Sequence, residues 1–546
     1  MRLVAKIIIG IVAAFALLVA AFFLFGRRLL INNAMSAYME RQITEQYGSA
    51  FETEKRKLEF PTSDSPLTQE IVSDLDTFLE TATIPDIKAR FVSTELDAET
   101  LVLYCLQRTQ AFDENKLNSV LELNPDALEI ARALDTERED GKVRGSLHGI
   151  PVLLKDNIAT GDKLHTSAGA LALKDARGDT DAFIVERLRD AGAIILGKAN
   201  LSELSNYMTS ESVNGYSTLG GHTRNPYGRF DVGGSSSGPS VAASANFATV
   251  TVGTETAGSL IYPAGQNSVV AFKPSLGAVS RDRIIPITEA QDTAGPIGRN
   301  VTDVAVLLSV LTAEDKSDPR AADAATLSEL DFTSFLEPNA LQGKRIGVIK
   351  SIGLESNLKQ DVIGAFEEAG AEVVEVTWQP ARVNYVPVLE YGIKHDLQSY
   401  FDMVGEASPV RSLDELIAFN KANLEVAAPY GQDLLEAAQE AELSETDYEA
   451  MVLANEKKAA SSIRSQLTEN NLDAFLSVSN ELSGDYAPAG FPAITVPAGY
   501  KASGEPVGIT LLGNYLSDAE LIGIAYAFEQ KMGARVAPNL SRWELE

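Results

Sequence analysis

The segment from residue 231 to residue 277 carries the residues best suited to nucleophilic chemistry. It is rich in Gly, Ser and Ala and contains two serine turns, GGSSSG at 233–238 and GTETAGS at 253–259. Small residues allow backbone N–H groups to point into one cavity, which is what the stabilisation of an oxyanion requires. A Gly/Ser turn is also a common structural turn, so this segment alone leaves the function open.

A serine nucleophile needs a base, and the sequence offers few histidines for that role. There is no GxSxG elbow, and the four histidines are scattered along the chain: His148, His165, His222 and His395. Lysine is the other available base if burial lowers its pKa from about 10.4 toward neutrality. Lys155 ends the apolar run 150–154 and fits that need. A lysine at a strand end can equally lie on the surface, so composition does not decide between the two.

An α/β sheet is the scaffold that the pattern predicts for these residues. The stretch GIPVLLK at 149–155 is typical of a short buried strand that delivers Lys155 at its end. Helical spacing of apolar residues at 184–191 precedes an apolar strand at 193–196, and the same alternation returns at 344–377. Alternation of helices and strands on this scale indicates an α/β fold.

Further elements are expected around the serine turns and at both ends of the chain. Pro239 follows the first serine turn and suits the first turn of a helix, and a strand is expected at 247–252. A capped helix is expected to start at Thr68, and another should cover 98–112. The stretch 410–470 is rich in Glu, Ala, Leu and Lys and is predicted to be purely helical.

Composition narrows the class of protein. The chain of 546 residues has 46 Lys plus Arg against 76 Asp plus Glu, a net charge of −30. Such an acidic chain repels phosphate backbones, which argues against a nucleic-acid partner. The single cysteine, Cys105, excludes an internal disulfide and a Cys-based zinc site. We therefore expect an acidic, metal-poor globular protein without disulfides.

Three motifs together resemble the amidase signature family of serine hydrolases: GIPVLLKDNI (149–158), the GGSSSG turn and GTETAGSLIYPA (253–264). Similar stretches continue with RDAGAIILGKANLSE (189–203), TRNPYG (223–228), QDTAGPIGRNVTD (291–303) and GFPAITVPAGY (490–500). The resemblance covers residues 69–540 in the family's order and is closest to the branch with bacterial peptide amidases. It implies a single large α/β amidase signature domain with a central mixed sheet flanked by helices.

The resemblance also implies a Ser–Ser–Lys triad. Lys155 matches the family's lysine, Ser235 the serine on a cis peptide bond, and Ser259, 24 residues later, the nucleophile. Backbone N–H groups of four residues would form the oxyanion hole: Thr256, Ala257, Gly258 and Ser259. Neutral Lys155 would take a proton from Ser235, which takes one from Ser259, and an acyl-enzyme would form and be hydrolysed. The resemblance implies that this chemistry requires no metal and no cofactor.

Several positions depart from the family's pattern and weaken any inference about the substrate: Pro239, Ala257, Ile261, Ser268 and Ala271. At 261 many members carry an Arg that pairs with the acidic residue at 255. Asp156 and Asn157 are expected to orient the lysine strand, and Thr254 either supports the serine hydroxyls or caps a turn. Asp292 lies in a shared stretch but receives no chemical role.

The amino-terminal run Ile7–Phe25 is uncharged over nineteen residues and nearly spans a bilayer core of about 30 Å. It is longer than the apolar part of a signal peptide and ends in bulky residues, so an uncleaved anchor is predicted. We expect an anchor at 1–28, a polar helical stalk at 29–68 and the amidase signature domain at 69–540. Basic residues flank both sides of the run, and an extracytoplasmic catalytic domain is the orientation we expect.

The leading hypothesis is a membrane-anchored, single-pass amidase that hydrolyses a small-molecule or peptide carboxamide. One alternative is a glutaminase-type subunit of a tRNA amidotransferase, which shares the signature. Another is a non-catalytic, membrane-tethered binding protein that keeps the fold. The sequence leaves the amide substrate and the oligomeric state open.

Overall fold

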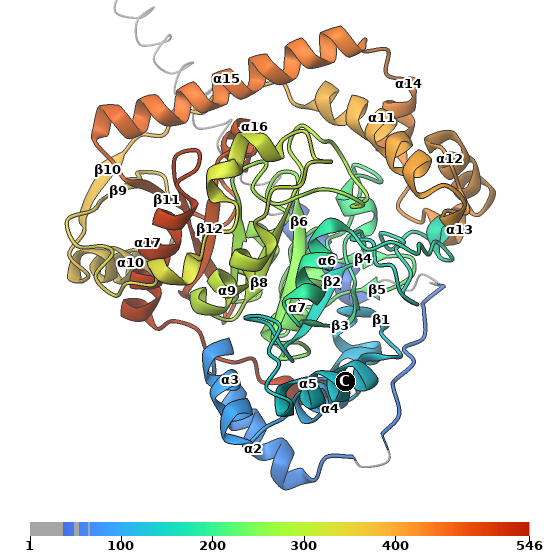
Figure 1. The fold of residues 1–546 in the computed structure, drawn as a ribbon. Coiled ribbons are helices and arrows are strands. Elements are labelled where there is room, and N and C mark those ends of the chain that lie inside the picture. Colours follow the sequence, from blue (N-terminus) through green and yellow to red (C-terminus); the bar gives the residue numbers. More distant parts are fainter. Residues whose placement is uncertain (1–36, 49–53, 64–65, 545–546) are drawn as a thin grey trace, which may run out of the picture. The chain divides into compact units, whose positions relative to one another are not determined.

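The computed structural model describes residues 37–48, 54–63 and 66–544 (Figure 1). The chain divides into two compact units, Met1–Ser49 and Ala50–Glu546. The described part of the first unit is a helix over residues 37–48. The elements labelled in Figure 1 belong to the second unit.

A mixed sheet of eleven strands forms the centre of the second unit, in the order β1-β3-β2-β6-β8-β7-β12-β13-β11-β9-β10. These strands are β1 (Val120–Leu123), β2 (Pro151–Lys155), β3 (Ile194–Ala199), β6 (Val250–Glu255), β7 (Val270–Lys273), β8 (Thr293–Gly298), β9 (Arg345–Ile349), β10 (Glu372–Val376), β11 (Ala474–Val478), β12 (Ala493–Tyr500) and β13 (Pro506–Leu512). Two short strands, β4 (Tyr216–Ser217) and β5 (Gly221–His222), pair separately.

Helices pack against both this sheet and one another. The helices that precede β9 in the chain are α2 (Gln69–Leu79), α3 (Ile84–Ser93), α4 (Ala98–Phe112), α5 (Ala127–Glu139), α6 (Phe183–Asp190), α7 (Ser237–Ser244), α8 (Ile261–Gln266) and α9 (Val301–Leu311). The helices that follow β9 are α10 (Ser356–Glu368), α11 (Val386–Val404), α12 (Leu413–Ala422), α13 (Leu424–Ala427), α14 (Asp433–Glu440), α15 (Glu445–Asn470), α16 (Ser483–Ala489) and α17 (Asp518–Met532). α7 contacts β6, α9 contacts β8 and α17 contacts β12, while α15 lies against α16 and α11 (Figure 1).

The strands β2 and β6 are the part of the sheet that positions the site. They are parallel neighbours, with Leu154 opposite Val252. Every residue of both strands is buried, as expected for parallel strands covered on both faces. Because the two strands run in the same direction, Lys155 and Glu255 at their carboxyl ends reach the same edge of the sheet.

The predicted α/β domain with a central mixed sheet and flanking helices is confirmed. The strand expected at 149–155 is β2, the helix expected at 98–112 is α4, and the helix expected after Thr68 is α2, which that threonine caps. The strand expected at 247–252 begins later, at Val250. The stretch 410–470 is helical as predicted, but loops divide it into four helices.

The predicted membrane localisation requires correction. Among the residues that the structure describes, no helix is both long enough and apolar enough to cross a bilayer. α15 has 26 residues but carries charged side chains along its length. The run Ile7–Phe25, on which the single-pass anchor and the extracytoplasmic orientation depended, lies outside the described residues.

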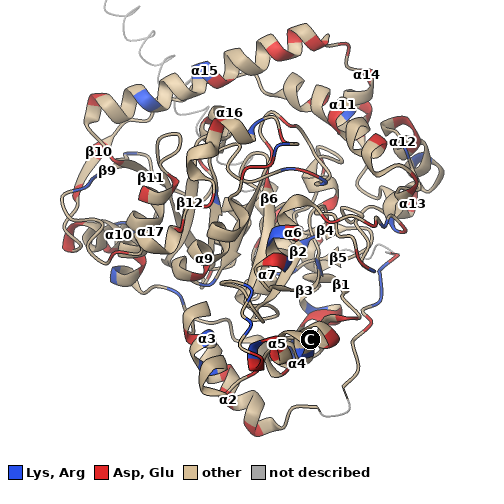
Figure 2. Ribbon diagram, in the orientation of Figure 1, with Lys and Arg blue, Asp and Glu red and all other residues tan. Residues whose placement is uncertain are grey.

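Acidic side chains are spread over the helices and loops of the second unit (Figure 2). They outnumber the basic ones by 76 to 46 in the whole chain. The acidic positions predicted from composition are therefore not confined to one group of elements.

Candidate active site

Lys155 is fully buried at the carboxyl end of β2. Its Nζ donates hydrogen bonds to Ser235 Oγ at 2.8 Å, to Thr254 Oγ1 at 2.8 Å and to the Thr254 carbonyl at 3.4 Å. Burial lowers the pKa of Lys155 to about 7, although the negative charges of Asp292 and Glu255 act in the opposite direction. A lysine with this pKa is partly neutral at pH 7 and can accept a proton.

The two serine turns are joined through Ser236. Its backbone N–H donates to the Ser259 carbonyl at 3.1 Å. Its hydroxyl donates to the Thr254 carbonyl at 2.9 Å and accepts from the Thr254 N–H at 3.2 Å. The peptide bond between Gly234 and Ser235, one residue earlier, is cis. Ser235 is thus held between Lys155 and the turn that carries Ser259.

The position of α7, the helix that follows the first serine turn, explains why residue 238 is a glycine. α7 begins at Ser237, with Pro239 in its first turn as predicted. A Cβ added at Gly238 would lie 2.2 Å from the Asn200 carbonyl oxygen and 2.5 Å from that of Ser119. The close approach of these backbones admits only glycine and fixes where the serine turn meets the sheet.

Glu255 organises the turn that carries Ser259. Its carboxylate accepts from the Gly258 N–H at 2.6 Å, the Leu260 N–H at 2.8 Å and the Ile261 N–H at 3.1 Å. Gly258 adopts a φ of +92°, a conformation that L side chains rarely adopt. Position 261 is Ile in this chain, and the Glu255 carboxylate is instead paired with backbone amides.

Ser259 lies where a substrate can reach it. The residue is half-buried and its neighbour Ala257 is exposed, whereas Lys155 and Ser235 lie beneath them and are fully buried. The N–H groups of Thr256, Ala257 and Ser259 have no hydrogen-bond partner within the described residues. The fourth predicted oxyanion donor, the Gly258 N–H, is already bound to Glu255.

A cavity of about 190 Å³ borders this turn, with Thr254, Thr256 and Asn157 in its lining. Asp292, to which the sequence assigned no role, also lines it. Asp292 accepts from Thr256 Oγ1 at 2.5 Å and from the Ile287 and Thr288 N–H groups at 2.8 and 3.0 Å. Burial raises its pKa to about 6. Asp292 therefore supports the residue that begins the Ser259 turn.

Asp156 and Asn157 hold the segment that follows Lys155. The Asp156 carboxylate accepts from the Ser167 and Gly169 N–H groups at 3.2 and 3.1 Å. The Asn157 amide donates to Thr254 Oγ1 at 3.1 Å and to the Ile285 carbonyl at 3.3 Å. Thr254 Oγ1 thus accepts from both Lys155 and Asn157, and connects β2 to β6 at the site.

Comparison with known proteins assigns the family. The Amidase family model matches residues 100–477. A protein named probable amidase, from Arabidopsis thaliana, is 38% identical over 475 residues, which are 84% of this chain and 92% of the relative. The chain belongs to the amidase signature family. Amidases of this kind are hydrolases that act on C–N bonds of amides, and the chain is such an enzyme.

Solved structures of other amidases share the fold. An amidase family protein from Bacillus anthracis str. Ames is 37% identical and superposes with a TM-score of 0.84 over 91% of this chain and 97% of its own. A native peptide amidase from Stenotrophomonas maltophilia is 41% identical, with a TM-score of 0.79 over 84% of this chain and 98% of its own. The predicted similarity to peptide amidases is confirmed.

Proposed function

We propose that the protein hydrolyses a carboxamide through a relay of Ser259, Ser235 and Lys155. The observation that carries this proposal is the 2.8 Å hydrogen bond between the fully buried Lys155 Nζ and Ser235 Oγ. The lowered pKa of Lys155 supplies a base at neutral pH. The contact of Ser236 with the Ser259 carbonyl brings the second serine turn beside the first.

In the relay, protons move from Ser259 toward Lys155 during the attack and return when the leaving group departs. Neutral Lys155 accepts the proton of Ser235, Ser235 accepts that of Ser259, and Ser259 Oγ attacks the amide carbonyl carbon. The proton then returns through the same groups to the leaving nitrogen as the C–N bond breaks. Water, activated by the same relay, attacks the acyl-enzyme and releases the acid. Ammonia or an amine is the other product.

The oxyanion that forms in both steps needs several aligned donors. The N–H groups of Thr256, Ala257 and Ser259 are the candidates, because they are unpaired within the described residues. The Gly258 N–H supports the turn through Glu255 instead of contributing a fourth donor. The likeness to a peptide amidase supports a small-molecule or peptide amide as the substrate.

Substitution and active-site labelling test the relay. Ser259→Ala should abolish both turnover and covalent capture of a serine-directed phosphonate. Lys155→Ala should be nearly as severe, and Ser235→Ala should retain more activity, because water can replace its hydroxyl. Residues acting as one unit are strongly non-additive, so the triple variant should be little worse than Ser259→Ala. A folded Lys155→Ala variant with near-normal turnover at pH 7 would refute the mechanism.

The same experiments address the two alternatives. A folded wild-type protein that no serine probe labels, and that hydrolyses no amide, would favour the non-catalytic binding protein. Stable co-purification with other subunits, together with activity only in their presence, would favour the glutaminase-type subunit. We expect labelling and hydrolysis by the isolated chain.

A further inference from the structure

One wall of the cavity beside the Ser259 turn is formed by α11. Asp396, Tyr400 and Met403 of that helix line the same cavity as Thr254 and Thr256. If Ser259 attacks the amide carbonyl, as proposed above, the part of the substrate beyond the amide extends toward α11. The groups along this wall then determine which substrates fit.

The two arginines that line the cavity are matched by their own carboxylates. Arg281 forms a two-point ion pair with Asp318, in which Nε lies 2.9 Å from Oδ2 and Nη2 binds Oδ1. Both side chains of this pair are almost buried. Arg283 Nε lies 3.7 Å from Asp282 Oδ2. Each of the two cations therefore has a carboxylate partner beside the cavity.

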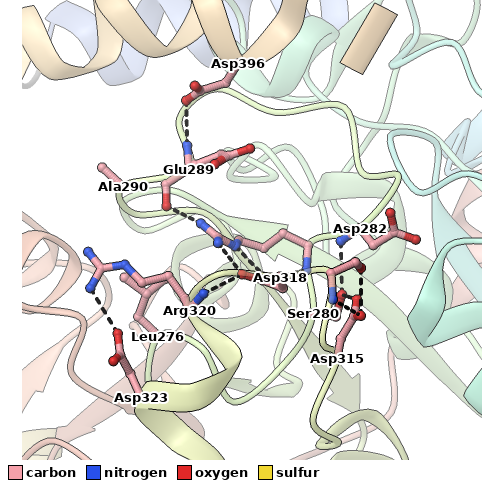
Figure 3. A network of polar contacts seen from close by, with 12 residues as sticks. Leu276, Ser280, Asp282, Glu289, Ala290, Asp315, Asp318, Arg320, Asp323 and Asp396 are labelled. Carbon is pink, nitrogen blue, oxygen red and sulfur yellow. Dashed lines mark hydrogen bonds and ion pairs between the residues drawn. The ribbon is translucent and has the colours of Figure 1, made fainter. Parts of the chain in front are cut away.

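Three further carboxylates of the lining form no ion pair within the described residues: Glu289, Asp292 and Asp396. Asp292 is satisfied by three donors. Asp396 points from its helix toward Glu289 (Figure 3), whose backbone N–H it binds through Oδ2 at 2.7 Å. Its Oδ1 has no hydrogen-bond partner in the described part of the chain. Burial, and then the charges of Glu289 and Asp292, raise the pKa of Asp396 to about 7.

The lining of the cavity also contains an unpaired acceptor. Asn157 is only 2% exposed, and its side-chain oxygen has no hydrogen-bond partner within the described residues. Its amide nitrogen is occupied by Thr254 and Ile285. A buried acceptor left unpaired costs about 1–3 kcal/mol, which a ligand N–H that reached this oxygen would offset. A carboxamide nitrogen is a donor of this kind.

We infer that the cavity selects amides that carry an ammonium group remote from the scissile bond, with the ammonium against Asp396 and an amide N–H on the Asn157 oxygen. The inference rests on the proposed function for the orientation of the substrate. It names the substrate class as amino-alkanamides and peptide amides with a cationic side chain or amino end. The excess of carboxylates over available cations in the lining accounts for the preference.

A matched substrate series tests this selection. Each ω-amino-alkanamide, from three to eight carbons, is paired with the alkanamide that has methyl in place of ammonium. For the chain length that spans the cavity, the wild-type kcat/KM should favour the ammonium amide at least about tenfold, the equivalent of one 1.4 kcal/mol interaction. Asp396→Asn keeps an acceptor for the Glu289 N–H but removes the charge, and the ratio should fall close to one, mainly through KM.

Asp402→Asn is the control, because Asp402 is exposed on the same helix and does not line the cavity. It removes the same charge and should keep the wild-type ratio. If Asp396→Asn does not fold, competitive inhibition of the wild type by n-alkylammonium ions replaces it. These ions should inhibit about tenfold more strongly than the n-alkanols of equal length.

Binding measurements separate this inference from the proposed function. Ser259→Ala should bind the ammonium amide more tightly than the neutral amide in calorimetry although it turns over neither. A wild-type ratio near one at every chain length, or an unchanged ratio in Asp396→Asn, would overturn the inference while leaving the relay intact. Normal turnover by Ser259→Ala would instead overturn the relay, and the selection ratio would still be measurable.

Discussion

Lys155 should give the enzyme its pH dependence. Burial lowers its pKa to about 7, so the base is protonated below pH 7 and neutral above it. For a neutral amide, kcat/KM should rise with pH through a midpoint near 7 and level off. A pH–rate profile between pH 5 and 9 measures this, at a fixed ionic strength. A profile that is flat, or that rises only near pH 10, would show that Lys155 is not the base.

The same residue should affect stability in a defined direction. Its folded pKa of about 7 lies below the ordinary lysine value of 10.5, so between these values the unfolded chain binds more protons. Its contribution to the free energy of unfolding therefore rises with pH across this window and is constant below it. At neutral pH the buried Lys155 therefore lowers the free energy of unfolding, although the proposed mechanism requires it.

At the scale of residues, the sequence was informative wherever function depends on a local motif. Lys155, Ser235 and Ser259 were predicted from their motifs, and whether they catalyse stays a prediction. Asp292 and Asp396 could not be recognised, because only folding brings their segments to the cavity. Nothing in the local pattern of α11 distinguishes Asp396 from the other two acids of the helix, Glu390 and Asp402.

The turn that follows β6 should depend on Glu255 for its shape. Three backbone N–H groups converge on this carboxylate, and the amide of a glutamine presents a donor where an acceptor is needed. Glu255→Gln should lower the free energy of unfolding by about 2 kcal/mol and reduce kcat by displacing the oxyanion donors. Chemical denaturation and steady-state kinetics measure the two effects.

Glu372→Gln is a suitable control, because Glu372 is an exposed acid on the edge strand β10. Its substitution should change the free energy of unfolding by less than about 1 kcal/mol. If Glu255→Gln were as stable and active as this control, Glu255 would not be organising the turn.

The positions of individual helices and strands could be predicted better than the order in which the strands pair in the sheet. Helical and strand periodicity located β2, α4 and α6 within a few residues. The order of the sheet could not be predicted, since β7 pairs with β12 more than 200 residues later in the chain. Local periodicity shows that a strand exists and which residues it buries, but it carries no information on so distant a partner.

For the molecule as a whole, the net charge of −30 predicts a response to salt. Acidic side chains are spread over the described elements (Figure 2), so their repulsion opposes compaction and is screened by ions. The thermal midpoint should rise by several degrees between 10 and 300 mM NaCl at pH 7.5. Scanning fluorimetry or calorimetry measures it, with KCl as the control for specific ion effects. A midpoint that falls with salt would mean that attractive ion pairs dominate.

The strand order also has a consequence for how the protein is made. β7 occupies the middle of the sheet, yet its partner β12 begins only at residue 493, so a nascent chain leaving the ribosome carries an unpaired edge at β7 throughout the synthesis of the intervening helices. Such an edge can capture strands from neighbouring nascent chains. We therefore expect the half-made sheet to depend on protection by chaperones until residues 493–512 close the gap between β7 and β11.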